Sequence, residues 1–216
     1  MKGPVVAIDG PAGSGKSTAG RAIADALGIP FIETGSMYRA LALAALRSET
    51  KLDDERALVS LIDDAKLEFS GGGARIEGED VSHLLRMPEV SAAASAIAVH
   101  PEVRAEMVKM QRTLVPESGA VVEGRDIGTV VLPDADVKVF LTASHEERAA
   151  RRTNEETPGG SVETPEQIQL RDRTDSERAA SPLVPAEDAI VIDSTSVPVD
   201  EIVKRILELC RSGLPS

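Results

Sequence analysis

The feature that most constrains the fold is a glycine-rich stretch near the start of the chain. Residues 10–18, Gly-Pro-Ala-Gly-Ser-Gly-Lys-Ser-Thr, match the pattern G-x-x-x-x-G-K-[ST]. The stretch follows an apolar segment at 5–8 and precedes a segment of helical spacing at 16–27, which stops at Gly28. Glycines let the backbone curl so that successive N–H groups face an anion, and the following helix adds its positive end. The sequence therefore predicts a phosphate-binding loop between a buried strand and a helix.

Two side chains of this loop carry specific expectations. Lys16 should reach the β- and γ-phosphates of a nucleoside triphosphate, and the Ser17 hydroxyl should bind Mg²⁺. Kinases, GTPases and motor ATPases share such a loop, so it leaves the reaction open. The chain has no Asn-Lys-x-Asp motif for guanine, and residues 121–123, Val-Val-Glu, are only a weak match to a strand ending in an acidic metal ligand. The loop residues predicted to bind ATP are Gly10, Pro11, Ala12, Gly13, Ser14, Gly15, Lys16, Ser17 and Thr18.

Short apolar runs alternate with longer amphipathic segments along the chain. Strands are expected at 5–8, 31–32, 120–122, 137–141 and 190–192, and helices at 16–27, 37–47, 102–114 and around 202–207. Near-continuous apolar strands separated by helices indicate a parallel sheet that is covered on both faces. We therefore expect an α/β fold in three layers with a central parallel sheet.

The middle of the chain follows a different pattern. Residues 67–70 and 74–77 alternate apolar and polar around three glycines at 71–73, which is typical of a β-hairpin. Two short helices are expected next, one before Pro88 and one at 90–99. We predict an inserted subdomain at 67–100 within a core formed by 1–66 and 101–216. A polar stretch at about 153–163 is predicted to form a short lid.

The charge balance limits the possible partners. The chain has 36 Asp and Glu against 24 Lys and Arg, a formal net charge of -12, which disfavours a nucleic-acid partner because such a surface repels phosphate backbones. The first ten residues are broken too early by Gly and Pro to form a signal peptide, and no apolar run is long enough to cross a bilayer. One cysteine, Cys210, leaves no internal disulfide. We expect a cytoplasmic monomer with no membrane partner.

Arginine is the candidate phosphate ligand. Phosphoryl transfer between two nucleotides concentrates negative charge in one cleft, and guanidinium groups bind phosphate oxygens in pairs. A solvated helix face is the simpler interpretation for Arg148 and Arg173. Arg125 differs, because it follows a buried strand, and ligands bind at the carboxyl ends of parallel strands. The arginines considered are Arg39, Arg104, Arg125, Arg148, Arg151, Arg152, Arg171, Arg173 and Arg178.

Five separate blocks give a more specific signal than the loop alone. They are IDGPAGSGK at 8–16, TGSMYRALA at 34–42, GRDIGTVV at 124–131, PDA at 133–135 and SPLVPA at 181–186. With these blocks the chain resembles bacterial cytidylate kinases over nearly its full length. The resemblance implies a P-loop kinase fold with a large inserted acceptor-binding region. It also implies transfer of the γ-phosphoryl group of ATP to CMP or dCMP, with Mg²⁺ as the cofactor.

The resemblance also implies roles for single residues. Thr34 stands where a serine is common in the family and keeps its hydroxyl. The implied catalytic cations are Lys16, Arg39 and Arg125. The implied ligands of the acceptor phosphate are Thr34, Arg39 and Arg125, and those of the cytosine are Ser95, Arg104 and Asp126. Arg171 and Asp175 match positions near the sugar, with Arg178 beside them, and the lid would begin with two further ATP ligands, Arg151 and Arg152.

The base-reading set also makes chemical sense. Cytosine presents O2 and N3 as acceptors and N4 as a donor; Arg104 only donates, an ionised Asp126 only accepts, and Ser95 can do both. Uracil reverses the pattern at N3 and position 4, which leaves buried polar groups unpaired at a cost of a few kcal/mol. Without the resemblance, Ser95 would pass for an ordinary small residue of the alanine-rich stretch at 91–98.

Three alternatives remain open at this point. The first is a kinase for another acceptor, such as UMP, AMP or a small metabolite. The second is a nucleotide-dependent switch of the GTPase class, which the missing guanine motif disfavours. The third is a P-loop protein that binds nucleotide without turnover. The three histidines, His83, His100 and His145, are expected at the surface or at helix ends rather than in catalysis.

Overall fold

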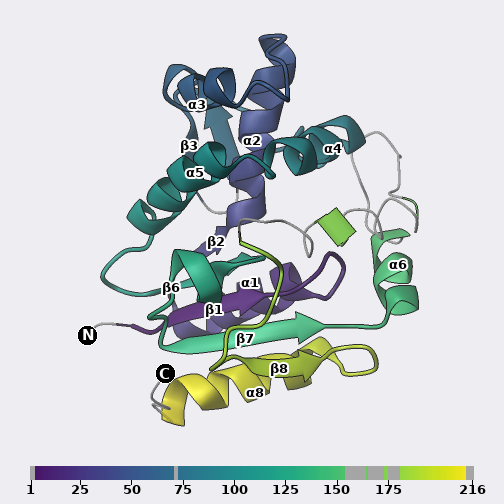
Figure 1. The fold of residues 1–216 in the computed structure, drawn as a ribbon. Helices are drawn as coiled ribbons and strands as arrows, with labels where there is room; N and C mark the ends of the chain where they lie inside the picture. The colour runs from purple at the N-terminus through teal and green to yellow at the C-terminus, as the bar shows by residue number, and fades with distance from the viewer. Residues whose placement is uncertain (1–2, 71–72, 154–163, 165–172, 175–180, 213–216) are drawn as a thin grey trace.

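A parallel sheet forms the lower body of the molecule (Figure 1). The computed structural model describes residues 3–70, 73–153, 164, 173–174 and 181–212. Five strands run parallel in the order β2-β6-β1-β7-β8, so that β1 lies in the centre. They are β1 (Val5–Asp9), β2 (Phe31–Glu33), β6 (Ala120–Gly124), β7 (Val137–Thr142) and β8 (Ile190–Asp193).

Helices cover both faces of this sheet. Val6 and Ile8 of β1 pack with α1 (Lys16–Leu27) and α8 (Val199–Ser212) on one face. Ala7, between them, points to the other face, where it packs with a π-helical turn, η1 (Ile127–Val131), near the end of α5 (Pro101–Thr113). Alternate residues of a strand point to opposite faces, so a strand buried on both sides must be apolar throughout. The expected three-layer α/β fold is confirmed.

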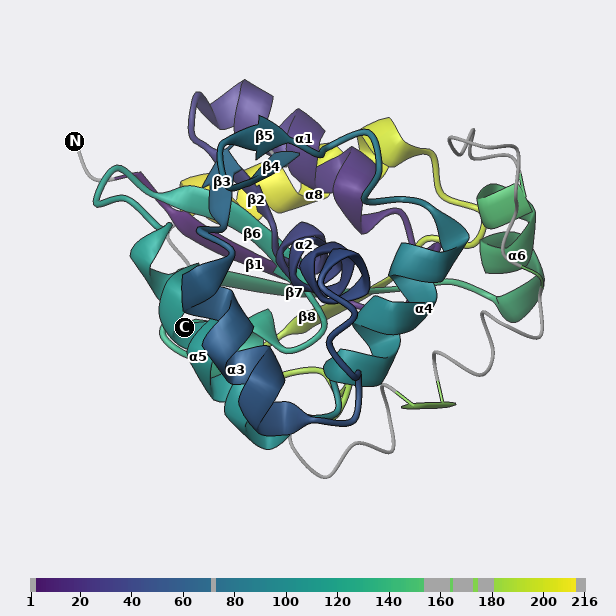
Figure 2. The same ribbon diagram turned by 90° about the horizontal axis from the view of Figure 1, so that it is seen from above.

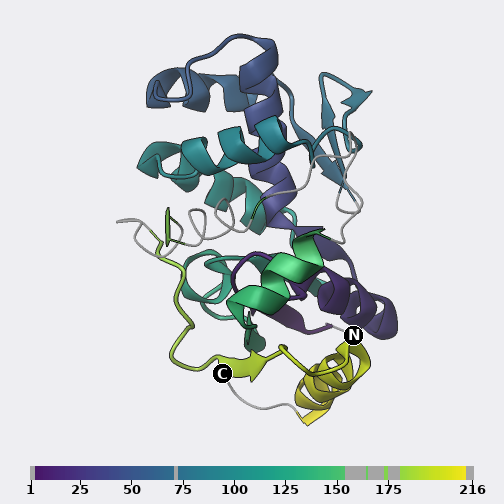
Figure 3. The ribbon, with the colours of Figure 1, turned by 90° about the vertical axis from the view of Figure 1, so that its right-hand side faces the viewer.

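A second body lies above the sheet and has its own hydrophobic core (Figures 1 and 3). Helix α2 (Thr34–Arg47) rises into it from the end of β2, and Figure 2 shows the other helices grouped around α2. These are α3 (Glu55–Asp64), α4 (Pro88–Ile97) and α5, with a small antiparallel sheet of β3 (Glu68–Ser70), β4 (Gly73–Ile76) and β5 (Glu79–Asp80). The core of this body therefore reaches beyond the insert expected at 67–100, on both sides.

Several local expectations differ from the structure. The helix expected at 37–47 begins at Thr34, directly after β2, and neither α3 nor β5 was anticipated. The helix expected before Pro88 is wrong: residues 82–86 form turns. Pro88 opens α4 and holds Met87 in an extended conformation, because a residue before proline disfavours helical geometry. Residues 154–163 of the expected lid lie outside the described residues. Among the described residues, no helix is both long enough and apolar enough to cross a bilayer.

Candidate active site

The glycine-rich loop joins β1 to α1 and has the backbone that its sequence predicts. Gly10 has a φ of 147° and Gly13 a φ of 74°, values that favour glycine. A Cβ at Gly10 would lie 2.0 Å from the carbonyl oxygen of Leu141, and one at Gly13 would lie 2.7 Å from that of Arg148. Both glycines are therefore required by backbone geometry and by the close approach of neighbouring elements.

The outer side of the loop is held by α6 (His145–Thr153) and by the segment after β8. Arg148 donates to the carbonyl of Ala12 at 3.2 Å, and the Ser194 hydroxyl donates to the carbonyl of Ser14 at 3.0 Å. Arg148 is buried, so its interpretation as a solvated helix residue is wrong. Arg148 lies on the same face of α6 as Arg151 and Arg152, so sequence spacing indicated a polar face, and only the packing shows that this face meets the loop.

The two arginines at the end of α6 differ in position. Arg151 donates to the Gly13 carbonyl at 3.4 Å, and to the hydroxyl and carbonyl oxygens of Ser194 at 3.0 and 2.7 Å. Arg152 instead lines the cavity described below. Arg151 thus supports the loop from outside, while Arg152 faces the space where a ligand would lie.

Lys16 is buried at the first turn of α1. Its ammonium group donates to the Pro11 carbonyl at 2.8 Å. Burial, and next the nearby charge of Arg125, together lower the pKa of Lys16 to about 7 against the opposing effect of Glu123. A triphosphate bound here would place negative charge beside this ammonium group and favour its charged form.

Glu123, at the end of β6, is an acidic residue that the sequence indicated only weakly. Its Oε1 accepts a hydrogen bond from the Ser17 hydroxyl at 3.0 Å. Its Oε2 is buried and has no hydrogen-bond partner among the described residues. Burial raises the pKa of Glu123, while Lys16 lowers it. A buried carboxylate oxygen without a partner, beside a serine hydroxyl, matches the oxygen ligands that Mg²⁺ prefers.

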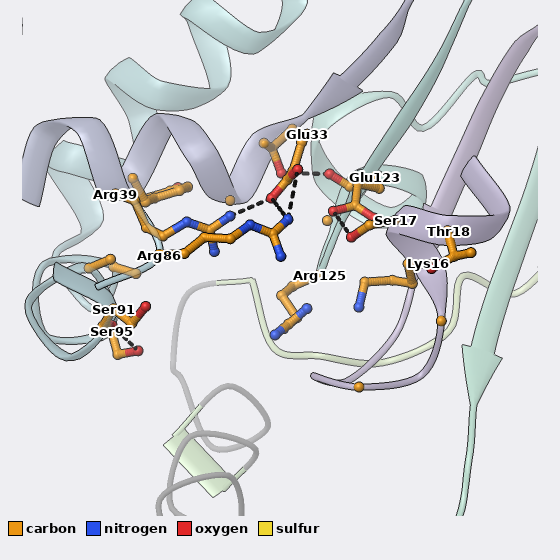
Figure 4. Close-up of a pocket in the computed structure, with 18 of the residues that line it drawn as sticks. Lys16, Ser17, Thr18, Glu33, Arg39, Arg86, Ser91, Ser95, Glu123 and Arg125 are labelled. Atoms are coloured by element: carbon orange, nitrogen blue, oxygen red, sulfur yellow. Dashed lines mark hydrogen bonds and ion pairs between the residues drawn. The ribbon is translucent and has the colours of Figure 1, made fainter. Parts of the chain in front are cut away.

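A second buried carboxylate, Glu33, is the last residue of the neighbouring strand β2. Glu33 is paired in register with Glu123 across β2 and β6. It forms ion pairs with Arg39 of α2 and, at 3.4 Å, with Arg86 (Figure 4). It forms a further ion pair with Arg21 of α1 at 2.9 Å. Arginines from three separate elements thus meet on one carboxylate.

Arg86 and Glu33 were not identified from the sequence. Arg86 lies in the turns before α4, where a helix was expected, and Glu33 is the last residue of a strand that was expected to end one residue earlier. Figure 4 shows Arg125 between Lys16 on one side and Arg39 and Arg86 on the other. Arg125 is held there by the Gly10 carbonyl, at 3.0 Å from its Nη1.

The residues expected to read the base, Ser95, Arg104 and Asp126, line the same cavity as Lys16 and Ser17. Arg104 and Asp126 are both buried and form an ion pair, and Arg104 also stacks on Tyr38 with its guanidinium carbon 5.8 Å from the ring centre. The Ser95 hydroxyl donates to the Ser91 carbonyl at 3.2 Å within α4. Thr34 donates to the carbonyl of Glu123 at 2.8 Å. The expected sugar ligands, Arg171, Asp175 and Arg178, lie outside the described residues.

One continuous cavity of about 650 Å³ joins these groups. Lys16 and Ser17 line it at the loop, Glu33 and Arg39 line it from β2 and α2, and Asp126 lines it just after β6. Its other lining residues among those discussed are Gly13, Gly15, Thr18, Arg21, Thr34, Tyr38, Arg86, Ser91, Ser95, Arg104, Glu123, Arg125 and Arg152. A phosphate-binding loop at the end of a parallel sheet, facing a pocket lined with arginines, defines a P-loop kinase.

Comparison with known proteins agrees with this class and narrows it. A gluconokinase structure from Sinorhizobium meliloti 1021 superposes with a TM-score of 0.54 at 18% identity, over 98% of this chain and 94% of that one, which is a likeness of fold. The family model for cytidylate kinase matches residues 6–212. The chain belongs to the cytidylate kinase family. Cytidylate kinases from Geobacillus sp. (strain WCH70) and Desulfitobacterium hafniense (strain Y51) are 49% and 47% identical to it, over 94% of this chain and 95% and 91% of theirs.

Proposed function

We propose that this protein transfers the γ-phosphoryl group of ATP to CMP or dCMP, producing ADP and CDP or dCDP. The observation that carries the proposal is the single cavity that joins Lys16 and Ser17 to the buried pair of Arg104 and Asp126. One end offers a triphosphate site and the other offers donors and acceptors that complement a pyrimidine. Membership of the cytidylate kinase family supports the same reaction.

The loop end of the cavity suits MgATP. The backbone of residues 10–18 would surround the phosphates, with Lys16 at the β- and γ-oxygens. Ser17 and Glu123 would hold Mg²⁺, which when bound neutralises charge on the β- and γ-phosphates. Arg152 would add a cation on the open side, whereas the contacts of Arg151 favour a role in supporting the loop.

The other end suits cytidine monophosphate. Arg104 would donate to O2 or N3 of the base, and Asp126 would accept from N4. Because these two side chains already pair with each other in the absence of ligand, neither is a buried charge without a counter-ion before the base arrives. Ser95, from α4, would be the third polar contact. Uracil would present a donor at N3 and an acceptor at position 4, against the pattern of this pair.

The transfer itself requires alignment and charge stabilisation rather than a strong base. The attacking oxygen of CMP is already anionic, so proton removal is not a barrier. Arg39 and Arg125, with Thr34, would hold the acceptor phosphate, and Lys16 and Arg125 would stabilise charge on the transferred group. Arg86 and Arg39 pair with the same carboxylate, Glu33, so Arg86 would also contact the acceptor phosphate. The expected result is direct in-line transfer without a phosphoenzyme.

The proposal includes a cytoplasmic monomer that binds no nucleic acid and no membrane. Residues assigned to both substrates, among them Lys16, Arg39 and Asp126, line one cavity within a single chain, which supports a monomer. The net charge of -12 disfavours nucleic acid. Free nucleotides, the proposed substrates, are metabolites of the cytoplasm.

A coupled assay of ADP release tests this function. CMP and dCMP should be turned over with a kcat/KM about a hundredfold above that of UMP, with AMP inactive. Substituting Asp126→Ala should remove the preference for CMP over UMP while the KM for ATP stays within about twofold. Equal rates with CMP and UMP would reject the assigned base pocket. GTP turnover without any acceptor would favour a switch protein instead.

A further inference from the structure

Asp9 is a buried carboxylate that neither the phosphate site nor the base site uses. It is the last residue of β1, directly before the glycine-rich loop, and is 5% exposed. Its Oδ1 accepts the backbone N–H of Ile127 at 2.8 Å, and its Oδ2 accepts that of Gly128 at 2.7 Å. Both oxygens therefore hold the start of η1, the turn that follows Asp126.

These two N–H groups need an acceptor from elsewhere. In η1 the N–H of Val131 bonds to the Asp126 carbonyl at 3.1 Å, and that of Leu132 bonds to the Ile127 carbonyl at 2.7 Å. The first N–H groups of any helical turn have no acceptor within the turn. A buried N–H without a partner is unfavourable, so the contacts to Asp9 fix the position of the turn.

Gly10, the residue directly after β1, holds the other side of the same segment. The Gly10 carbonyl accepts from Arg125 at 3.0 Å, while Asp9 holds the backbone just after Asp126. Asp9 and Gly10 thus hold the Arg125–Asp126 segment on both sides. The phosphate-binding loop starts at the same two residues, Asp9 at the end of β1 and Gly10 directly after it, so the loop and the Arg125–Asp126 segment share one anchor.

We propose that Asp9 is a positioning residue that aligns the Arg125–Asp126 segment with the phosphate-binding loop, and thereby aligns the acceptor nucleotide with the donor. The inference rests on the function proposed above. Asp9 does not line the cavity; it acts through the backbone of Ile127 and Gly128. Burial raises the pKa of Asp9 to about 6, against the two backbone hydrogen bonds, which leaves the carboxylate mainly ionised at neutral pH and able to accept with both oxygens.

Asp9→Asn tests the proposal because it keeps the size of the side chain and removes one acceptor. The new amide NH₂ would face one of the two backbone N–H groups, so the turn must shift. The KM for CMP should rise about tenfold and the preference for CMP over UMP should fall by a similar factor, while the KM for ATP stays within about twofold. Steady-state kinetics with each substrate varied in turn measures this split.

Asp136→Asn is the matched control. Asp136 also accepts a backbone N–H of β1, that of Val5 at 2.7 Å, but at the opposite end of the strand and at an exposed position. This variant should leave both KM values and the base preference unchanged. If Asp9→Asn does not fold, Asp9→Glu keeps two acceptor oxygens on a longer side chain and should show the same split to a smaller degree.

The outcomes are distinguishable from failure of the proposed function. Wild-type protein that fails to phosphorylate CMP overturns both proposals together. Wild-type protein that is active, with an Asp9 variant that raises the KM values for ATP and CMP equally, overturns the positioning role alone. The same holds for an Asp9 variant that lowers only the melting temperature.

Discussion

Binding of MgATP should draw a proton from solution onto Lys16. The pKa of Lys16 is about 7 in the free protein because the ammonium group is buried beside Arg125. At pH 8 roughly 10% of Lys16 is therefore charged, and at pH 6 roughly 90%. Triphosphate oxygens beside the ammonium group should return its pKa toward the ordinary value of 10.5. Binding should then take up about 0.9 proton at pH 8 and about 0.1 at pH 6.

Titration calorimetry in several buffers measures this uptake. The slope of the observed enthalpy against the ionisation enthalpy of the buffer gives the number of protons exchanged. The matched variant is Lys16→Arg, because a guanidinium group stays charged throughout this range. Glu123 is present in both proteins, so any proton that it releases on binding Mg²⁺ contributes to both slopes. The difference between the two proteins isolates Lys16.

A small or absent difference at pH 8 would refute the reasoning. It would mean that Lys16 is already charged in the free protein, so that burial does not dominate its environment. A difference that is as large at pH 6 as at pH 8 would assign the proton to another group.

Three further predictions concern Glu123, Glu33 and Arg148, whose contacts only the structure shows. Glu123→Gln keeps a contact to Ser17 but loses the charge, so turnover should fall about a hundredfold and half-maximal activity should need more Mg²⁺; an unchanged Mg²⁺ titration would reject Glu123 as a ligand. Glu33→Gln should raise the KM for CMP about tenfold because Arg39 loses its anchor, and tighter CMP binding would instead show that Glu33 competes with the phosphate. Arg148→Ala should lower the free energy of unfolding by about 2 kcal/mol in urea, against little change for exposed Arg205→Ala; equal effects would contradict the buried role.

The phosphate-binding loop and the strands around it could be predicted from the sequence because each depends on residues that are close together along the chain. The loop needs glycines at fixed positions, and each strand of a covered parallel sheet needs an unbroken apolar run. Helix α1 begins and ends where expected, with Gly28 in the left-handed conformation at its C-terminus. The turns before Pro88 were mistaken for a helix because apolar spacing alone does not report the restriction that proline places on the residue before it.

The site was predicted in part. Lys16, Arg39, Arg104, Arg125 and Asp126 line one cavity, but their assigned roles remain predictions. Glu33 and Arg86 were missed, since neither lies in a pattern that marks phosphate chemistry. Their relevance comes from ion pairs between a strand end and a turn 53 positions away.

The sequence by itself determined that the chain has a loop shaped for phosphate and a sheet to carry it, because both depend on residues that are neighbours along the chain. The tertiary structure alone decided that Glu123 meets Ser17 across 106 positions, and that Asp9 holds the turn after Asp126. It also buried Arg148 against the loop. Such pairs depend on which strand ends lie side by side in the sheet, and that order is set by packing of the whole chain rather than by any local pattern.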